Sequence, residues 1–200
     1  MLDTFAPLTF LGNHDVTRLA SRLDDQRHLA HALAILLTVG GTPSIYYGDE
    51  QGRQGIKEER RGGDDAIRPA FPTQGPIGLP SDGSPIHDLH SQLIRLRRQH
   101  RWLHRARTRP LHLSNRQLIY ESRLGDHQIV VALNLDDTPS NRAIPARPVL
   151  LAGTGTLNGA DDSAIELALP PHGWAILGAE RDALDDAAGA DLDGVALAGR

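Results

Sequence analysis

The chain of 200 residues contains no cysteine. Disulfide bonds and thiolate metal sites are therefore excluded, and cysteine usage says nothing about the redox compartment. No stretch approaches the roughly 20 consecutive apolar residues of a membrane-spanning helix. Residues 1–10 also lack the basic region and long apolar run of a signal peptide. We therefore expect a cytoplasmic protein with no membrane partner.

An excess of positive charge is absent, and aromatic side chains are scarce. The formal net charge is −4, which argues against a nucleic-acid partner or an anionic membrane. The chain has three Phe, two Trp and three Tyr, and Trp102, Trp174 and Tyr120 are the side chains available for stacking on a sugar. So few aromatic residues argue against a dedicated carbohydrate-binding platform.

Residues 8–15, LTFLGNHD, join an apolar run to three polar side chains. The apolar run over 8–11 is typical of a strand that is buried on both faces, and Gly12 permits a sharp turn. Burying polar groups at 13–15 for packing alone would be costly unless each is hydrogen-bonded. A strand that ends in polar side chains is how parallel α/β proteins build sites.

His14 and Asp15 are therefore the first candidates for chemistry. A carboxylate beside an imidazole suits acid/base work or the holding of a hydroxyl-rich substrate. The alternative is a structural role, in which Asp15 caps the loop by accepting backbone N–H bonds. Asp49 and Glu50, after the second predicted strand, are interpreted as structural carboxylates.

The next segments predict a βαβ unit. Residues 16–25 are expected to form a polar, irregular loop, in which Asp24 or Asp25 caps a helix over 26–39. The second half of this helix is apolar on nearly all sides and should be deeply buried. Residues 44–47, SIYY, predict a short strand parallel to the first.

A long loop and an amphipathic helix follow. Residues 51–85 are rich in glycine, proline and charge, and a loop of this length is usually functional or disordered. Within it, Asp64, Asp65 and Arg68 could place a charged pair over a cleft, or form a local salt bridge worth less than ~1 kcal/mol. The apolar spacing of residues 86–101 predicts the amphipathic helix.

The pattern changes from Thr108 onward to short apolar segments separated by turn residues. This spacing predicts an antiparallel sandwich, with a domain boundary near residue 105 and a hairpin turn at Gly125-Asp126. Residues 179–200 are acidic, rich in Ala and Gly, and expected to be a disordered tail. The predicted strands are 111–113, 117–122, 128–135, 147–151, 164–169 and 173–177.

Two histidine pairs have a spacing that can ligate a metal, namely His28 with His31 and His87 with His90. No third ligand follows either pair at a useful spacing. We therefore expect packed or surface histidines, no metal and no cofactor. A small metalloprotein is the least favoured of the functional hypotheses.

Two motifs together resemble the alpha-amylase family of glycoside hydrolases. They are FLGNHD at 10–15 and GTPSIYYGDE at 41–50. By this resemblance the first strand is the seventh of a (β/α)₈ TIM barrel and the second is the eighth. The fold class implied is α/β plus all-β. Residues 1–105 would supply the last two βα units of the barrel, 106–178 a C-terminal antiparallel β-sandwich, and 179–200 the tail.

The resemblance also implies roles for single residues. Asp15 would be the family's third carboxylate, which binds sugar hydroxyls and favours the distorted ring, and His14 would hydrogen-bond the same sugar. The loop GGDDAIRPAFP at 62–72 is similar to that of neopullulanase-like members. Asp65 and Arg68 would then lie nearer the next glucose unit of an α-glucan oligosaccharide.

The nucleophilic Asp and the acid/base Glu of this family lie on the fourth and fifth barrel strands, which residues 1–200 do not contain. Retaining hydrolysis needs both carboxylates. We therefore expect a fragment of a retaining α-glucan hydrolase that is inactive alone and needs the missing barrel part, or self-association, to cover its strands. The alternative is a non-catalytic carbohydrate- or protein-binding module.

Overall fold

The structure is a computed structural model that describes residues 5–71, 84–144, 148–159 and 165–179. It divides into two compact units. The N-terminal unit is Met1–Arg97 with Leu103–Ala106, and the sandwich unit is Arg98–Trp102 with Arg107–Arg200. Of the predicted tail, Ala179 ends a strand, and the rest lies outside the described residues.

The N-terminal unit contains a two-stranded parallel sheet, formed by β1 (Leu8–Phe10) and β2 (Thr42–Ser44). Leu8 pairs with Thr42 and Phe10 with Ser44, so the parallel pairing is confirmed. The prediction of a strand over 44–47 is wrong in its bounds, because β2 begins two residues earlier and ends three residues earlier. Tyr46 and Tyr47 lie beyond the ladder, and Tyr47 Oη donates to Pro69 O at 2.8 Å.

Two helices connect β1 to β2. The short α1 (Leu19–Arg22) lies in the segment predicted to be an irregular loop, and α2 (His28–Thr38) confirms the predicted helix. Its second half is buried as expected. Arg27, the residue before the helix, already has helical backbone angles and makes no side-chain cap bond. The Asp25 side chain accepts from the backbone N of Arg27 at 2.9 Å, so Asp25 caps the turn that leads into α2, as predicted.

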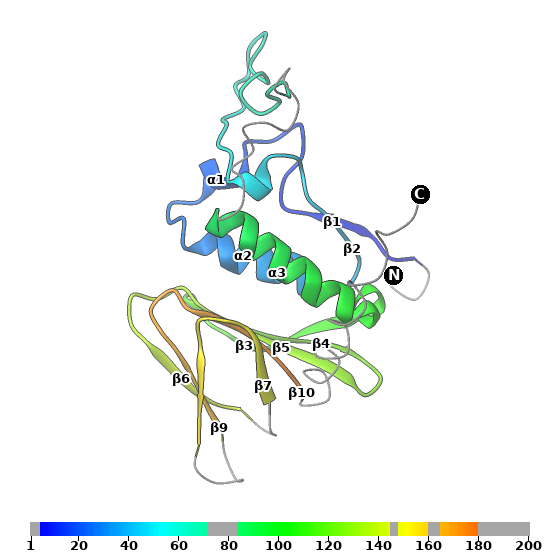
Figure 1. Cartoon of the computed structure of the whole chain (residues 1–200). Helices are drawn as coiled ribbons and strands as arrows, with labels where there is room; N and C mark the ends of the chain where they lie inside the picture. The colour runs from blue at the N-terminus through cyan, green and yellow to red at the C-terminus, as the bar shows by residue number, and fades with distance from the viewer. Residues whose placement is uncertain (1–4, 72–83, 145–147, 160–164, 180–200) are drawn as a thin grey trace, which may run out of the picture. The chain divides into compact units, whose positions relative to one another are not determined.

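Helix α3 (Pro85–Gln99) lies beside α2 (Figure 1). It confirms the helix predicted over 86–101, and it buries Leu93, Leu96 and His90. The guanidinium of Arg97 donates to the carbonyls of Leu37 and Val39 at the end of α2, at 3.2 and 2.6 Å. Burial lowers the pKa of Arg97 to about 10. The short 3₁₀ helices are η1 (Asp49–Gln51) and η2 (Arg101–Arg105).

Strand β1 is not buried on both faces. Leu8 is 63% exposed and Phe10 is 50% exposed. Each of the two strands has a single partner, so each keeps one open edge among the described residues. The exposure agrees with the expectation that two strands alone leave their apolar faces uncovered.

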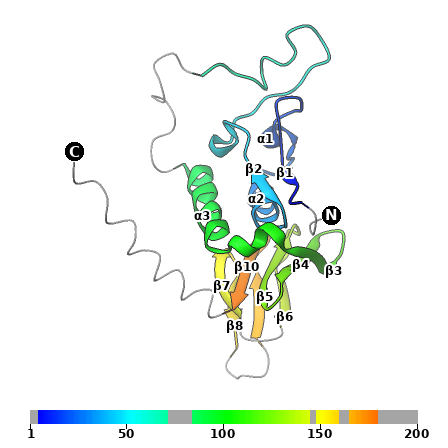
Figure 2. The same cartoon turned by 90° about the vertical axis from the view of Figure 1, so that its right-hand side faces the viewer.

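The sandwich unit has two antiparallel sheets, ordered β3-β4-β5-β10-β7 and β6-β9-β8 (Figures 1 and 2). Its core takes residues from both sheets, including Ile119, Ala132, Ile144 and Leu167. Leu124 pairs with His127, which confirms the two-residue hairpin turn. The sequence predicted neither β6 nor β8. The bounds are β3 (Arg107–Leu113), β4 (Gln117–Leu124), β5 (His127–Asn134), β6 (Ser140–Ile144), β7 (Pro148–Gly153), β8 (Thr156–Asn158), β9 (Ile165–Leu169) and β10 (Trp174–Ala179).

Candidate functional site

The loop that follows β1 presents His14 and Asp15 at the end of the parallel strand pair. The backbone N of Asp15 donates to Asn13 Oδ1 at 2.8 Å, so Asn13 folds the loop and leaves the carboxylate of Asp15 outside the turn. His14 Nε2 lies 3.3 Å from Asp15 Oδ2, and both side chains are more than half exposed. The polar groups of the strand end therefore face solvent.

Arg68 connects this loop to the long loop after β2. Its Nη2 lies 2.7 Å from Asp15 Oδ1, and its Nε donates to the carbonyl of His14 at 2.7 Å. Residues separated by 53 positions are thus joined by a charge-assisted bond and a second hydrogen bond. The structure brings together three of the four predicted site residues: His14, Asp15 and Arg68.

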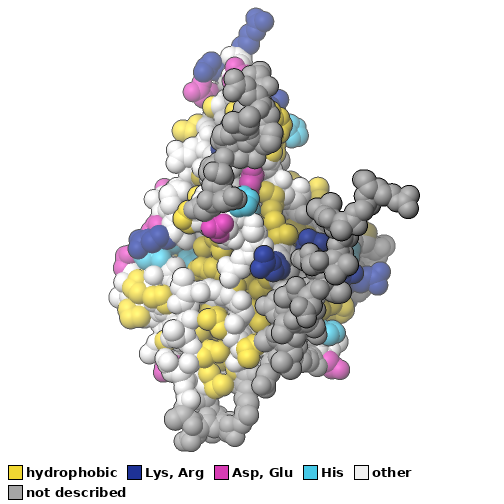
Figure 3. Space-filling model, viewed as in Figure 1, with side chains coloured by type: hydrophobic (Ala, Val, Ile, Leu, Met, Phe, Trp, Pro, Cys, Tyr) yellow, Lys and Arg dark blue, Asp and Glu magenta, His cyan; other side chains and the backbone are white. Residues whose placement is uncertain are grey.

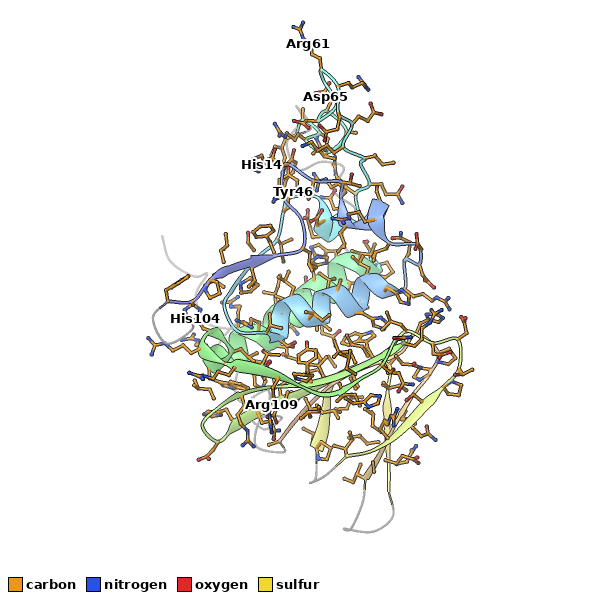
Figure 4. All side chains as sticks on the ribbon, turned by 180° about the vertical axis from the view of Figure 1, so that it is seen from behind. His14, Tyr46, Arg61, Asp65, His104 and Arg109 are labelled. Atoms are coloured by element: carbon orange, nitrogen blue, oxygen red, sulfur yellow. The ribbon has the colours of Figure 1, made fainter. Side chains whose placement is uncertain are left out.

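Asp65 is the predicted residue that lies outside this cluster. Its neighbour Asp64 contacts Arg68 instead, with Oδ2 at 2.8 Å from Nη2. Figure 4 shows Asp65 farther out on the loop than His14, with Arg61 beyond it. A turn explains the difference, because Ile67 N and Arg68 N both donate to Asp64 O and so direct the Asp64 side chain toward Arg68.

A buried arginine, Arg18, was missed by the sequence analysis. Its Nη1 donates to Tyr47 O at 2.6 Å and lies 2.9 Å from Asp49 Oδ1, and its Nη2 donates to Ile67 O at 2.9 Å. The guanidinium therefore joins the segment after β1, the segment after β2 and the loop that carries Arg68. An arginine three residues after an Asn-His-Asp motif is the only sequence signal for it.

Aromatic rings enclose the Arg18 guanidinium. Its Cζ lies 4.3 Å from the ring centroid of Tyr46 and 5.2 Å from that of Tyr47. The Tyr47 ring in turn stacks on Phe71, with centroids 4.9 Å apart. Burial raises the pKa of Tyr46. These contacts give the base of the candidate site a fixed shape.

Asp49 is confirmed as a structural carboxylate. Burial raises its pKa above the usual value, although the hydrogen bond and the charge of Arg18 act in the opposite direction. Glu50 is engaged locally, since its Oε2 accepts from Gly48 N at 2.7 Å. Both carboxylates are therefore held by hydrogen bonds within the segments that follow β1 and β2.

The candidate stacking residues and histidines are mostly committed to packing. Tyr120 and Trp174 are buried in the sandwich unit, so neither can stack on a ligand. Trp102 stacks on the ring of His127, with centroids 5.5 Å apart. His90 is buried with its Nδ1 at 2.8 Å from Ile86 O.

Within the described ranges, no helix is long and apolar enough to cross a membrane.

The exposed cluster of His14, Asp15 and Arg68 at the end of β1 is the arrangement with the clearest chemistry. Asp15 offers two carboxylate oxygens, each with lone pairs that Arg68 and His14 do not use. Such a group can accept hydrogen bonds from the hydroxyls of a substrate.

Comparison with protein families places residues 2–75 in the family described as alpha amylase, catalytic domain. The cyclomaltodextrin glucanotransferase of Bacillus sp. (strain 38-2) is 29% identical over 84% of this chain and 24% of its own length. The alpha-amylase of Niallia circulans is 32% identical over 74% of this chain and 26% of its own. The chain spans about a quarter of the length of these relatives.

Solved structures agree. The acarbose-soaked debranching enzyme of Nostoc punctiforme superposes with a TM-score of 0.66 at 27% identity, over 86% of this chain and 33% of that one. AmyP in complex with maltose gives a TM-score of 0.70 at 19% identity, over 88% and 41%, and so supports the fold alone. These matches span both units, and the family resemblance seen in the two motifs is confirmed.

Proposed function

Because the chain belongs to the alpha-amylase family of glycoside hydrolases, we propose that it contributes the transition-state-stabilising carboxylate, Asp15, to a retaining enzyme that cleaves α-glucosidic bonds in maltodextrin- or starch-like substrates. In this proposal β1 and β2 are the seventh and eighth strands of the (β/α)₈ barrel. The relatives that match the chain are named cyclomaltodextrin glucanotransferase and alpha-amylase, which supports an α-glucan as the ligand.

The observation that carries the proposal is the exposed Arg68–Asp15–His14 cluster at the end of β1. A carboxylate kept only to cap a loop would accept backbone N–H bonds. Here it is Asn13 that accepts the loop N–H, while Asp15 is held by side chains from two segments. Asp15 is therefore positioned by its neighbours and open to hydroxyl groups.

Asp15 cannot perform retaining hydrolysis by itself. The reaction needs a nucleophilic carboxylate and a second acid/base carboxylate about 5–5.5 Å apart across the glycosidic bond. In the proposal both come from barrel strands outside residues 1–200. The same strands would cover Leu8 and Phe10, whose exposure marks a face of the sheet that needs a further layer.

Arg68 and His14 would assist Asp15. Arg68 holds one oxygen of Asp15 and the carbonyl of His14, so it sets the direction of the carboxylate. His14 would donate to a hydroxyl of the same sugar. Asp65, on the outer part of the loop, would lie nearer the next glucose unit.

The first test measures activity with and without the remaining barrel. Residues 1–200 alone should hydrolyse neither maltodextrin nor aryl α-glucosides above the buffer rate. A chimera that joins the barrel region preceding the matched segment in the Niallia circulans alpha-amylase to this chain should hydrolyse both. Turnover that follows residues 1–200 through several chromatographic steps would refute the division of the active site.

The second test replaces Asp15 with Asn in the active chimera. Hydrogen bonds to a charged group are worth about 1.5–3 kcal/mol each, and those that tighten in the transition state lower kcat with little effect on KM. We expect kcat to fall by roughly two orders of magnitude at about 1.4 kcal/mol per decade. The melting temperature should be unchanged.

Asp64→Asn is the matched control. Asp64 contacts the same Nη2 of Arg68 as Asp15 does, but the proposal gives it no contact with the sugar. We expect it to change kcat by less than about tenfold, because a partly exposed ion pair is worth less than ~1 kcal/mol. If Asp15→Asn keeps nearly full kcat, Asp15 is a structural cap and the proposal is wrong.

A further inference from the structure

The sandwich unit contains a cavity of about 630 Å³ between its two sheets. Residues from β3, β4, β5, β6, β7 and β10 line it, far along the chain from the cluster at the end of β1. Its volume is in the range of roughly 300–1,000 Å³ that is typical of small-molecule sites. Nothing in the proposed function uses this cavity.

Aliphatic side chains make up most of its wall. They come from both sheets: Leu111, Ile119, Val130 and Leu177 from the larger and Ile144 from the smaller. No Phe, Trp or Tyr is among the lining residues. Sugars are usually held by stacking on aromatic rings combined with many hydrogen bonds, so this wall suits a flexible hydrocarbon and not a carbohydrate.

Arg142 of β6 supplies a positive charge at the cavity wall. Its Nη2 donates to Gln117 Oε1 at 2.7 Å and lies 3.2 Å from His112 Nε2. Its Nε has no hydrogen-bond partner among the described residues. None of these contacts is to a carboxylate, so the guanidinium is not neutralised by them.

The adjoining part of the same sheet face is also positive. Arg107 pairs with Arg123 in the β3–β4 ladder, and Arg123 pairs with Gln128, a lining residue of the cavity. Residues paired across a ladder share a face of the sheet. Glu121 lies on the same face, where its carboxylate accepts hydrogen bonds from Arg109 and from Gln128. Three arginines therefore share one carboxylate there, and this part of the face keeps an excess of positive charge. Asp126, in the β4–β5 turn, is the acidic residue among those that line the cavity.

We propose that the cavity between the two sheets binds a free aliphatic carboxylate of medium chain length, with its hydrocarbon chain against the aliphatic wall and its carboxylate at Arg142. Hydrophobic burial would supply most of the affinity, because each buried methylene group contributes about 0.8 kcal/mol. The guanidinium would select an anionic head group through charge-assisted hydrogen bonds.

The experiment uses the full chain and sodium decanoate as the probe, below its micellar concentration. Isothermal titration should show saturable binding, and methyl NMR should show shifts at Val130, Ile144 and Leu177. The methyl groups of Leu167 and Leu169, in the core and outside the lining, should shift least. Maltoheptaose should cause no shift at the cavity methyl groups.

Arg142→Gln tests the charge. We expect it to weaken decanoate binding by about tenfold or more and to leave the binding of 1-decanol unchanged, so that the preference for the anion is lost. Arg116→Gln, a change of the same kind at an exposed arginine in the β3–β4 loop outside the lining, should change neither. A thermal melt of each variant establishes that the sandwich is folded.

Several results would overturn the proposal. They are the absence of saturable decanoate binding, equal decanoate affinity in Arg142→Gln and the unaltered chain, or methyl shifts that fall outside the cavity. Shifts of the cavity methyl groups by maltoheptaose would show that the occupant is a sugar. In the lower half of Figure 3, hydrophobic side chains reach the surface of the sandwich unit. Decanoate that adsorbs weakly to this surface would not saturate, so saturation of the titration distinguishes binding in the cavity from adsorption.

Discussion

The sandwich unit and the β1–β2 pair differ in the burial of their apolar residues. In the sandwich unit, Leu167 and Ile176 are fully buried and each strand belongs to a sheet of at least three. In the β1–β2 pair, Leu8 and Phe10 are largely exposed. The sandwich unit buries these residues in its own core, whereas the β1–β2 pair leaves its apolar side chains exposed among the described residues.

The two units also differ in how they hold a buried carboxylate. In the sandwich unit, burial acts to raise the pKa of Glu121, but hydrogen bonds from Arg109 and Gln128 outweigh it and lower the pKa below its usual range. In the N-terminal unit, burial raises the pKa of Asp49 despite Arg18. Burial therefore decides the direction only where the partners are too few to outweigh it.

The largest loss of stability should come from replacing Arg18. Arg18→Met leaves the Asp49 carboxylate without its partner and three segments without their link, and removing one member of a buried pair typically costs about 3–5 kcal/mol. We expect hydrogen exchange at the amides of α2 to become faster, because the free energy of opening should fall by the same about 3–5 kcal/mol. Arg68→Met, which removes a half-exposed arginine from two ion pairs, should cost less than ~1 kcal/mol.

Equal exchange rates in the two variants would show that the Arg18 network does not hold the N-terminal unit together. The sandwich amides serve as the internal reference, because Arg18 lies in the other unit.

A pair of leucine substitutions tests the difference in burial directly. Leu167→Ala empties space in the sandwich core and should lower the free energy of unfolding by about 2–5 kcal/mol. Leu8→Ala removes an exposed side chain and should change it by less than about 0.5 kcal/mol. Chemical denaturation followed by the fluorescence of buried Trp174 measures the change in the sandwich unit, and hydrogen exchange at the amides of α2 measures the change in the N-terminal unit. A large loss from Leu8→Ala would mean that β1 is covered in solution, for example by a second copy of the chain.

The smallest expected effect is the dependence of the stability of each unit on pH. Because the folded-state pKa of Glu121 is lowered, its contribution is present above about pH 4.5, the usual value, and is lost as the pH falls through the folded-state pKa. Because the folded-state pKa of Asp49 is raised, its contribution is present below about pH 3.8 and is lost as the pH rises through the folded-state pKa.

Acidification from pH 6 should therefore remove the contribution of Glu121 to the sandwich unit and restore that of Asp49 to the N-terminal unit. Hydrogen bonds from Arg27 lower the pKa of Asp25, which lies in the N-terminal unit as well and acts in the opposite direction, so each carboxylate is tested by its own variant. Amide exchange should show a flatter pH profile for the sandwich unit in Glu121→Gln, and for the N-terminal unit Asp49→Asn should remove a contribution that grows on acidification. A change of the opposite sign in either variant would contradict the assignment of that carboxylate.

The sequence by itself determined the elements whose residues follow a clear local period. The apolar spacing of residues 28–38 specifies a buried helix, and the residues of 127–134 specify a strand, because each pattern depends only on neighbours along the chain. The short strands β6 and β8 were missed because their sequences, SNRAI and TLN, contain only two and one apolar residues and so show no apolar segment. The position of His14 and Asp15 at a strand end was likewise local and was predicted.

Only the tertiary structure decided which side chains meet there. Arg68 reaches Asp15 across 53 positions, Asp64 and not Asp65 shares that arginine, and Arg18 reaches Asp49 across 31 positions. These contacts depend on the path of the loop that carries Arg68 and on the turn at Asp64. Neither can be predicted from the spacing of apolar residues along the chain. The exposure of Leu8 and Phe10 was decided in the same way, because the burial of a strand depends on what is packed against it and not on its own residues.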